Sequence, residues 1–160
     1  MALKIRNAKK EDIKELAKIY SQTYTKKYSG EKWTTKQAEK YLNHMLKKQP
    51  DLAFLAEIDG KIVGGYFASV VPWSDGNHLV NGDIFVHPDY QKSGAGLELG
   101  KALYSKAVKK YNCVKSESIT FKNKKFPLSW HEKRGFKVSK DLIFIEGNTK
   151  DMLKRMKKMS

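Results

Sequence analysis

The chain has 160 residues, 40% of them hydrophobic, which suits one folded domain with its own core and excludes a disordered polypeptide. Its formal net charge of +15 indicates attraction to polyanionic ligands, but nearly all the cations are lysines spread along the chain, which disfavours dedicated nucleic-acid binding. The single cysteine, Cys113, excludes an internal disulfide, and no long apolar run or leader-like segment is present, so we expect a cytoplasmic protein.

The first third of the chain predicts a short strand and two helices. Leu3–Arg6 is typical of a strand, and apolar residues at three- and four-residue spacing predict an amphipathic helix from about Glu11. A polar loop is expected over Tyr24–Lys32. Thr34 and Gln37 then have the spacing of a capping box, which predicts the start of the second helix.

A hairpin follows these helices. Ala53–Ile58 and Lys61–Val70 have the apolar content of strands, and Asp59-Gly60 between them is typical of a tight hairpin turn. Gly64-Gly65 inside the second strand indicates a bulge or a close backbone approach. We expect a loop from Trp73 to Asn77.

The second half alternates strands and helices. Leu79–His87 is predicted as a strand and Gly94–Tyr111 as a helix. The remaining predicted elements are strands Ser116–Phe121, Phe136–Val138 and Leu142–Glu146, a short helix Leu128–Arg134, and a basic helix Lys150–Lys158. This order favours a single α/β domain with a mixed sheet and helices on both faces.

A glycine turn between the predicted strand and helix is the most informative motif. Gln91-Lys92-Ser93-Gly94-Ala95-Gly96 places several backbone N–H groups at a helix N-terminus with few side chains in the way. The first N–H groups of a helix lack intrahelical partners, and the helix dipole is positive there. The turn therefore predicts a site for phosphate oxygens.

This turn, after the strand end Phe85-Val86-His87-Pro88, resembles the acyl-CoA-binding motif of the GNAT N-acetyltransferase superfamily. Trp130-His131-Glu132-Lys133-Arg134-Gly135-Phe136 is similar to the late helix of that family. Ile5-Arg6-Asn7-Ala8, followed by Asp12, is similar to the opening strand and helix of the family. The resemblance implies one N-acetyltransferase domain over residues 1–160, with a mixed, mostly antiparallel sheet. It also implies transfer of an acetyl group from acetyl-CoA to a primary amine, by direct attack in a ternary complex.

The resemblance implies where acetyl-CoA would bind. The main chain of Ile84, Phe85 and Val86 would pair with the pantetheine amides. The residues that would contact the pyrophosphate are Gln91, Lys92, Ser93, Gly94, Ala95, Gly96 and Leu97. Where the family often has Asn, this chain has Lys124 with Asn123 beside it. We therefore expect that the contacts to the far end of the cofactor differ from those usual in the family.

Two side chains are candidates for catalysis. His131 stands where most family members have a tyrosine that protonates the departing thiolate, and an imidazole can donate a hydrogen bond or a proton there. Asp83 alternates with Phe85 on the predicted strand, where a carboxylate could accept the amine proton or hold the substrate ammonium. For each, a purely structural or surface role stays open. We expect His44 and His78 at the surface.

Two other functions stay open: a catalytically inactive acyl-CoA-binding protein of the same fold, and a less favoured basic nucleic-acid-binding module. The acceptor would be an amine-bearing small molecule or protein, and a homodimer is compatible with the resemblance. Glu31, Asp75 and Asp83 are too few acidic residues to predict a polyamine pocket on so positive a chain. No His/Cys cluster has metal-ligand spacing, so no metal is expected.

Overall fold

Five strands form one sheet in the computed structural model, which describes residues 2–159. The strands run in the spatial order β1-β2-β3-β4-β5. Their bounds are β1 (Leu3–Asn7), β2 (Ala53–Ile58), β3 (Lys61–Trp73), β4 (Gly76–Val86) and β5 (Cys113–Ser116). The first four pair antiparallel and β5 joins β4 in parallel, which confirms the predicted mixed, mostly antiparallel sheet.

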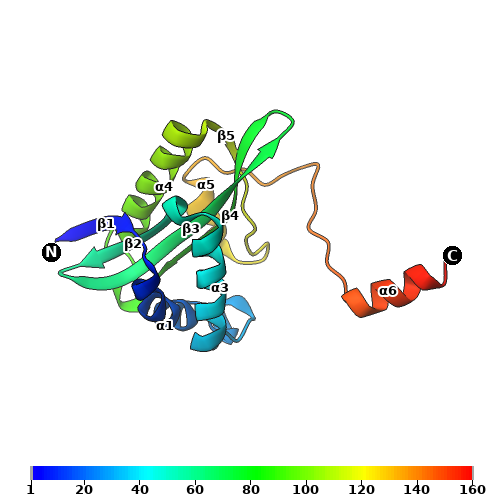
Figure 1. Ribbon diagram of the computed structural model, residues 1–160, viewed down its shortest axis with the longest axis horizontal. Helices are drawn as coiled ribbons and strands as arrows, with labels where there is room; N and C mark the ends of the chain where they lie inside the picture. The colour runs from blue at the N-terminus through cyan, green and yellow to red at the C-terminus, as the bar shows by residue number, and fades with distance from the viewer. Residues whose placement is uncertain (1, 160) are drawn as a thin grey trace. The chain divides into compact units, whose positions relative to one another are not determined.

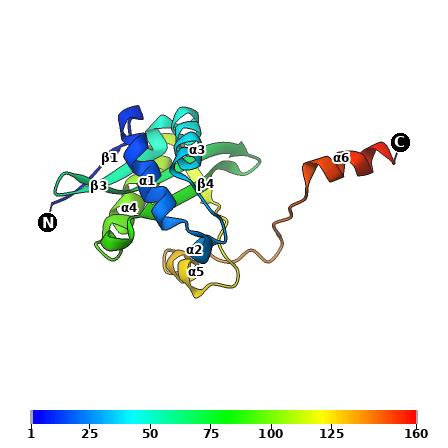
Figure 2. The ribbon, with the colours of Figure 1, turned by 90° about the horizontal axis from the view of Figure 1, so that it is seen from below.

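Helices cover both faces of this sheet (Figure 1). The helices that pack on the sheet are α1 (Ile13–Thr23), α3 (Thr35–Lys48) and α4 (Ala95–Tyr111). The other helices of the described residues are α2 (Lys26–Ser29), α5 (Lys125–Glu132) and α6 (Thr149–Lys157). Figure 2 looks onto α1 and α3, which lie on one face, whereas α4 lies on the other. The described chain divides into two compact units, one ending at Ile119 and one from Thr120 onward, and each is described by itself.

Local sequence signals explain most boundaries of the first unit. The Thr34 hydroxyl accepts the Gln37 N–H and the Gln37 side chain accepts the Thr34 N–H, which confirms the capping box. Gly60 lies at φ +78° in the hairpin turn, a conformation that glycine adopts without steric cost. A Cβ on Gly64 would stand 2.4 Å from the Phe85 carbonyl oxygen, so the expected close backbone approach is also confirmed.

The core consists of one apolar layer on each side of the sheet. Buried residues of α1 and α3 pack with Phe67 and Phe85 on one face. Buried residues of α4 pack with Tyr66 and Leu79 on the other. Amphipathic helices facing alternating strands bury their apolar stripes in this way and leave the charged faces in water.

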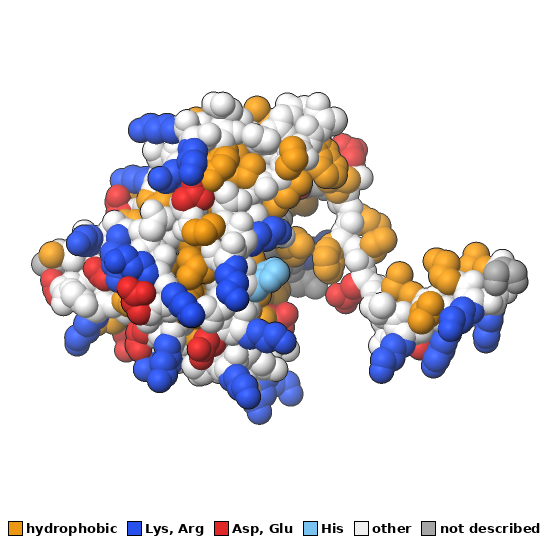
Figure 3. All heavy atoms as spheres, viewed as in Figure 1, with side chains coloured by type: hydrophobic (Ala, Val, Ile, Leu, Met, Phe, Trp, Pro, Cys, Tyr) orange, Lys and Arg blue, Asp and Glu red, His pale blue; other side chains and the backbone are white. Residues whose placement is uncertain are grey.

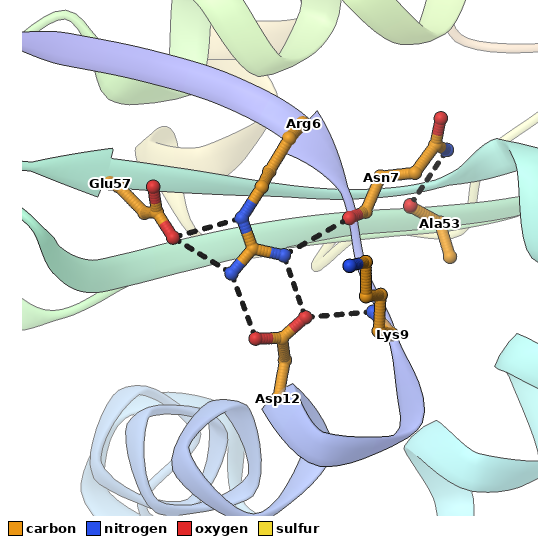
Figure 4. Close-up of polar contacts among 6 residues, drawn as sticks. All are labelled: Arg6, Asn7, Lys9, Asp12, Ala53 and Glu57. Atoms are coloured by element: carbon orange, nitrogen blue, oxygen red, sulfur yellow. Dashed lines mark hydrogen bonds and ion pairs between the residues drawn. The ribbon is translucent and has the colours of Figure 1, made fainter.

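A partly buried ion-pair network joins β1 to the start of α1 (Figure 4). The Arg6 guanidinium donates two hydrogen bonds to Asp12, at 2.7 and 2.8 Å, and one to Glu57 on β2, at 2.9 Å. The Lys9 N–H also donates to Asp12. Hydrogen bonding from Arg6 lowers the pKa of Asp12, and the same bond raises the pKa of Arg6. This bidentate pairing fixes the angle at which the chain leaves the sheet.

Several predicted boundaries are wrong. The strand expected over Ser116–Phe121 instead occupies Cys113–Ser116, because β5 begins directly after the left-handed cap residue Asn112 and pairs with Asn77–Leu79. The loop expected over Tyr24–Lys32 contains the short helix α2. Strand β3 continues beyond the predicted end to Trp73, and the expected Trp73–Asn77 loop is a tight turn.

The second unit lacks the two strands that the sequence predicts. Residues 136–138 and 142–146 form no strand, and Leu142 to Ile145 are exposed. High strand propensity does not produce a strand without a hydrogen-bonding partner. Helix α6 follows the prediction within one residue at each end. Figure 3 shows hydrophobic side chains along one side of α6 and Lys and Arg side chains along the other.

Candidate active site

A bulge in β4 determines which face of the sheet carries Asp83. Phe67 pairs with Asp83 and Ser69 pairs with Val80, so Ala68 opposes two residues, Asn81 and Gly82. Strand side chains alternate between faces, and one extra residue reverses the alternation. Leu79 accordingly lies on the α4 face, whereas Asp83 and Phe85 lie on the face covered by α1 and α3.

Tyrosine hydroxyls from two helices surround the Asp83 carboxylate. Tyr20 on α1 donates to Oδ2 at 2.7 Å, and Tyr24, the C-cap residue directly after α1, donates to Oδ1 at 2.8 Å. Tyr41 on α3 adds a further favourable contact. Burial raises the pKa of Asp83, and the hydrogen bonds from Tyr20 and Tyr24 offset part of that rise. A carboxylate with a raised pKa is a better proton acceptor than an exposed aspartate.

The tyrosines belong to an aromatic cluster that holds them rigidly. The Tyr20 ring centroid lies 4.6 Å from that of Tyr24, 5.1 Å from those of Trp33 and Phe85, and 5.7 Å from that of Tyr41. Such tilted and edge-on contacts restrict the rings and direct the hydroxyls at Asp83. The sequence predicted an amphipathic helix from about Glu11 but carried no signal that Tyr20 and Tyr24 meet the carboxylate.

Glu31 adds a second negative charge near this cluster. It accepts a hydrogen bond from the Trp33 indole N–H at 2.8 Å, and its charge raises the pKa of Asp83. Asp75, by contrast, pairs with His78. The site is therefore locally acidic on a strongly positive chain, through two of the three carboxylates that the sequence analysis considered.

The second half of β4 has a free edge. Within the described residues, β4 pairs with β5 only from Asn77 to Leu79, and the Glu117 N–H adds one bond to the Leu79 carbonyl. Ile84, Phe85 and Val86 lie beyond this point and pair only with β3 on the other side. A strand with an open edge offers backbone groups to an extended ligand.

The glycine turn has the expected strand-to-helix geometry. A 3₁₀ turn at Pro88–Tyr90 precedes it, Lys92 and Gly94 adopt left-handed φ values of +70° and +92°, and α4 begins at Ala95. A left-handed residue beside a right-handed one, as Gly94 is beside Ala95 at the start of α4, directs successive N–H groups into one concavity, which favours anion binding. No atom of the first unit lies within 4 Å of the place where a Gly94 Cβ would stand.

Three of the six N–H groups from Lys92 to Leu97 are free to bind a ligand. Ser93 donates to the Tyr90 carbonyl, Leu97 to the Gly94 carbonyl, and Ala95 to the Ser93 hydroxyl. The other three N–H groups of this segment, those of Lys92, Gly94 and Gly96, donate to no protein acceptor among residues 2–159. The Lys92 side chain is exposed beside them, and the Gln91 side chain donates to the Val86 carbonyl at 3.4 Å.

His131 lies in the second unit, at the end of α5. Its ring contacts those of Trp130 and Phe136 edge-on, at 5.1 and 5.2 Å, and Arg134 stacks on Trp130 at 3.6 Å. His131 is 8% exposed and its Nδ1 has no hydrogen-bond partner among the described residues. Burial lowers the pKa of His131, and the Arg134 charge adds to this effect, so its imidazole is neutral at pH 7.

Asn123 and Lys124 also belong to the second unit, just before α5 begins at Lys125. Both are polar, and the Lys124 ammonium lies 4.9 Å from the centre of the Phe121 ring. The structure thus brings Asp83, the open edge of β4 and the glycine turn together in the first unit. His131, Asn123 and Lys124 belong to the second unit.

One histidine departs from the sequence analysis. His44 is exposed as expected, but His78 is 2% exposed, and its two ring nitrogens lie 2.7 Å from Asp75 and Glu117. These carboxylates compensate for its burial. His78 joins the β3–β4 hairpin to the end of β5, and no signal along the sequence indicated it because Glu117 is 39 residues away.

Comparison with protein-family models gives one match, the acetyltransferase (GNAT) family, over residues 13–136. The chain belongs to the GNAT acetyltransferase family. Its membership supports acyl transfer as the general activity of the protein. Comparison with curated proteins finds no match.

Solved structures show the same fold. A possible acetyltransferase from Clostridium difficile 630 has a TM-score of 0.73 at 16% identity, covering 92% of this chain and 99% of its own. AAC(6')-Iy in complex with the bisubstrate analogue CoA-S-monomethyl-acetylneamine has a TM-score of 0.71 at 18% identity, with coverage of 92% and 99%. A ribosomal-protein-alanine N-acetyltransferase from Brucella melitensis biovar Abortus 2308 has 0.65 at 18%, also with 92% and 99%.

Within residues 2–159, no helix is long and apolar enough to cross a bilayer. The same residues contain no cluster of three or more His, Cys, Asp or Glu side chains that could hold a metal ion.

Proposed function

We propose that this GNAT protein transfers an acetyl group from acetyl-CoA to a primary amine of a small molecule or protein, by direct attack within a ternary complex. One observation carries the proposal. The open edge of β4 leads directly into a turn with three free N–H groups, and the same strand carries Asp83. The proton acceptor for an amine therefore lies on β4, and the backbone donors for an anionic cofactor lie in the turn that follows this strand.

The residues of the turn fit a pyrophosphate. The left-handed Lys92 and Gly94 hold the free N–H groups, and the absence of a Gly94 Cβ leaves room for the approaching oxygens. The exposed Lys92 ammonium would neutralise phosphate charge, with Gln91 and Ser93 at the rim. The main chain of Ile84, Phe85 and Val86 would hold the pantetheine arm, with Ala95, Gly96 and Leu97 at the helix start, and Asn123 and Lys124 would contact the far end.

Acetyl-CoA would supply a thioester whose carbonyl carbon reacts with the free amine. The protein has to produce that free amine and to stabilise the negative charge of the departing thiolate. Asp83 would accept the proton of the acceptor ammonium, since burial already favours its protonated form. A neutral His131 would donate an N–H hydrogen bond to the departing sulfur, and among the described residues its Nδ1 has no hydrogen-bond partner.

A CoA-release assay across amino acids, polyamines, aminoglycosides and peptides tests this function, with the acetylated product identified by mass spectrometry. Direct attack predicts intersecting initial-velocity patterns and no acetylated enzyme. Acetyl-CoA binding by calorimetry without turnover on any amine would instead favour an inactive acyl-CoA-binding protein. Affinity for nucleic acid that falls steeply with salt, without affinity for acetyl-CoA, would favour the basic binding module.

A further inference from the structure

The Tyr24 hydroxyl faces two acceptors at once. Its oxygen lies 2.8 Å from Asp83 Oδ1 and 2.9 Å from the Ile84 carbonyl oxygen. A phenol carries a single hydrogen, so Tyr24 can donate to only one of them at a time. Tyr20 differs in this respect, because its hydroxyl bonds to Asp83 alone among these two acceptors.

The protonation state of Asp83 decides which acceptor receives the Tyr24 hydrogen. An ionised carboxylate is the stronger acceptor, so Tyr24 donates to Asp83 and the Ile84 carbonyl lacks this hydrogen bond. A protonated Asp83 can itself donate from Oδ1 to the Tyr24 oxygen. The Tyr24 hydrogen is then free to rotate toward the Ile84 carbonyl. Each donor in this run of hydrogen bonds from Asp83 through Tyr24 to Ile84 then has an acceptor.

We propose that Tyr24 is a positioning residue that couples the protonation of Asp83 to the Ile84 carbonyl, and that this coupling selects acceptors that arrive as ammonium ions, with one N–H for the Ile84 carbonyl and a second for Asp83. While Asp83 is ionised, the Ile84 carbonyl can accept an N–H of the ammonium. The ammonium then loses one proton to Asp83: its N–H bond breaks, an O–H bond forms at Asp83, and the neutral amine keeps its electron pair. The rotated Tyr24 hydroxyl satisfies Ile84 after the transfer. The catalytic meaning of this coupling rests on the proposed function.

The surroundings of Asp83 are consistent with this role. The groups acting on it are Tyr20 from α1, Tyr24 directly after α1, Tyr41 from α3 and Glu31 from the loop between α2 and α3. The three hydroxyls lower the pKa of Asp83, and the Glu31 charge raises it. Burial and the Asp83 charge raise the pKa of Tyr24 far above 10, so Tyr24 stays a neutral phenol throughout.

Carbon-13 NMR of the ligand-free protein tests the coupling without any assay of activity. With labelled aspartate and isoleucine, the Asp83 carboxyl and the Ile84 carbonyl are followed as pH is raised. We expect both signals to titrate with one shared pKa, because Ile84 gains a hydrogen bond when Asp83 is protonated. An Ile84 signal that ignores the Asp83 titration in the unaltered protein overturns the proposal, even if no variant folds.

Matched variants separate coupling from simple hydrogen bonding. Tyr24→Phe and Tyr20→Phe each remove one bond to the carboxylate, so each is expected to raise the pKa of Asp83 by about one unit. Only Tyr24→Phe should abolish the response of Ile84. Tyr111→Phe, which removes a 2.7 Å bond to Asp51 elsewhere in the first unit, should change neither signal. An Ile84 response that survives in folded Tyr24→Phe refutes the role of Tyr24.

Kinetics then link the coupling to catalysis. With a working amine, the rising limb of the kcat/KM profile should move to higher pH in Tyr24→Phe, by the same amount as the NMR pKa of Asp83. A limb that stays in place while the NMR values move shows that the coupling exists but does not serve the reaction, which overturns the catalytic part. Absence of turnover in the unaltered protein contradicts the proposed function instead, and the NMR result stands apart from it.

Discussion

Gly94 offers a direct test of the proposed acyl-CoA site, and Gly60 offers its matched control. Both glycines have left-handed φ values, +92° and +78°, and a Cβ added at either would meet no atom within 4 Å. An alanine in this region costs roughly 1–2 kcal/mol of backbone strain. Gly94→Ala and Gly60→Ala should therefore lower the free energy of unfolding by similar amounts, measured by urea denaturation.

Affinity for acetyl-CoA should separate the two variants. At Gly94 the new Cβ would occupy open space beside the free N–H groups, and any relaxation of φ would turn those groups away. We expect the dissociation constant measured by calorimetry to rise at least about tenfold, or about 1.4 kcal/mol, in Gly94→Ala alone. Gly60 turns the β2–β3 hairpin and should leave affinity unchanged. Equal affinities in the two folded variants would refute the assignment of the glycine turn as the phosphate site.

Further predictions concern Asp12, Gly64 and His131. Asp12→Asn should lower stability by roughly 2–3 kcal/mol at pH 7, because it weakens charge-assisted bonds to a side chain that is only 9% exposed. Folding lowers the pKa of Asp12, so its contribution to the free energy of unfolding is present above about pH 4 and is lost as pH falls further. If the difference in free energy of unfolding between the unaltered protein and Asp12→Asn does not shrink below about pH 4, this account is contradicted. Gly64→Ala should destabilise by about 2 kcal/mol or more, because its Cβ would meet the Phe85 carbonyl at 2.4 Å, whereas Gly82→Ala, with its nearest contact at 3.4 Å, should have a smaller effect in the same denaturation assay. His131→Ala should reduce single-turnover acetyl transfer by about 10²-fold with acetyl-CoA affinity near normal, and unchanged turnover would remove His131 from the mechanism.

The sequence alone determined the features that depend on neighbouring residues. The capping box at Thr34, the hairpin turn at Asp59-Gly60 and the helix start after Gly94 all follow from steric demands and hydrogen bonds within a few positions. These local signals, in their order along the chain, were enough for the fold class and for the resemblance to the GNAT family.

The tertiary structure decided how distant residues meet. Asp83 faces the tyrosines only because a bulge at residues 81 and 82 reverses the alternation of β4, and a bulge depends on the register with β3. His78 is buried because Glu117 reaches it from the end of β5. The apolar residues 142–146 form no strand, since propensity cannot supply a hydrogen-bonding partner. Register, burial and partners are properties of chain segments far apart, so periodicity within one segment cannot encode them.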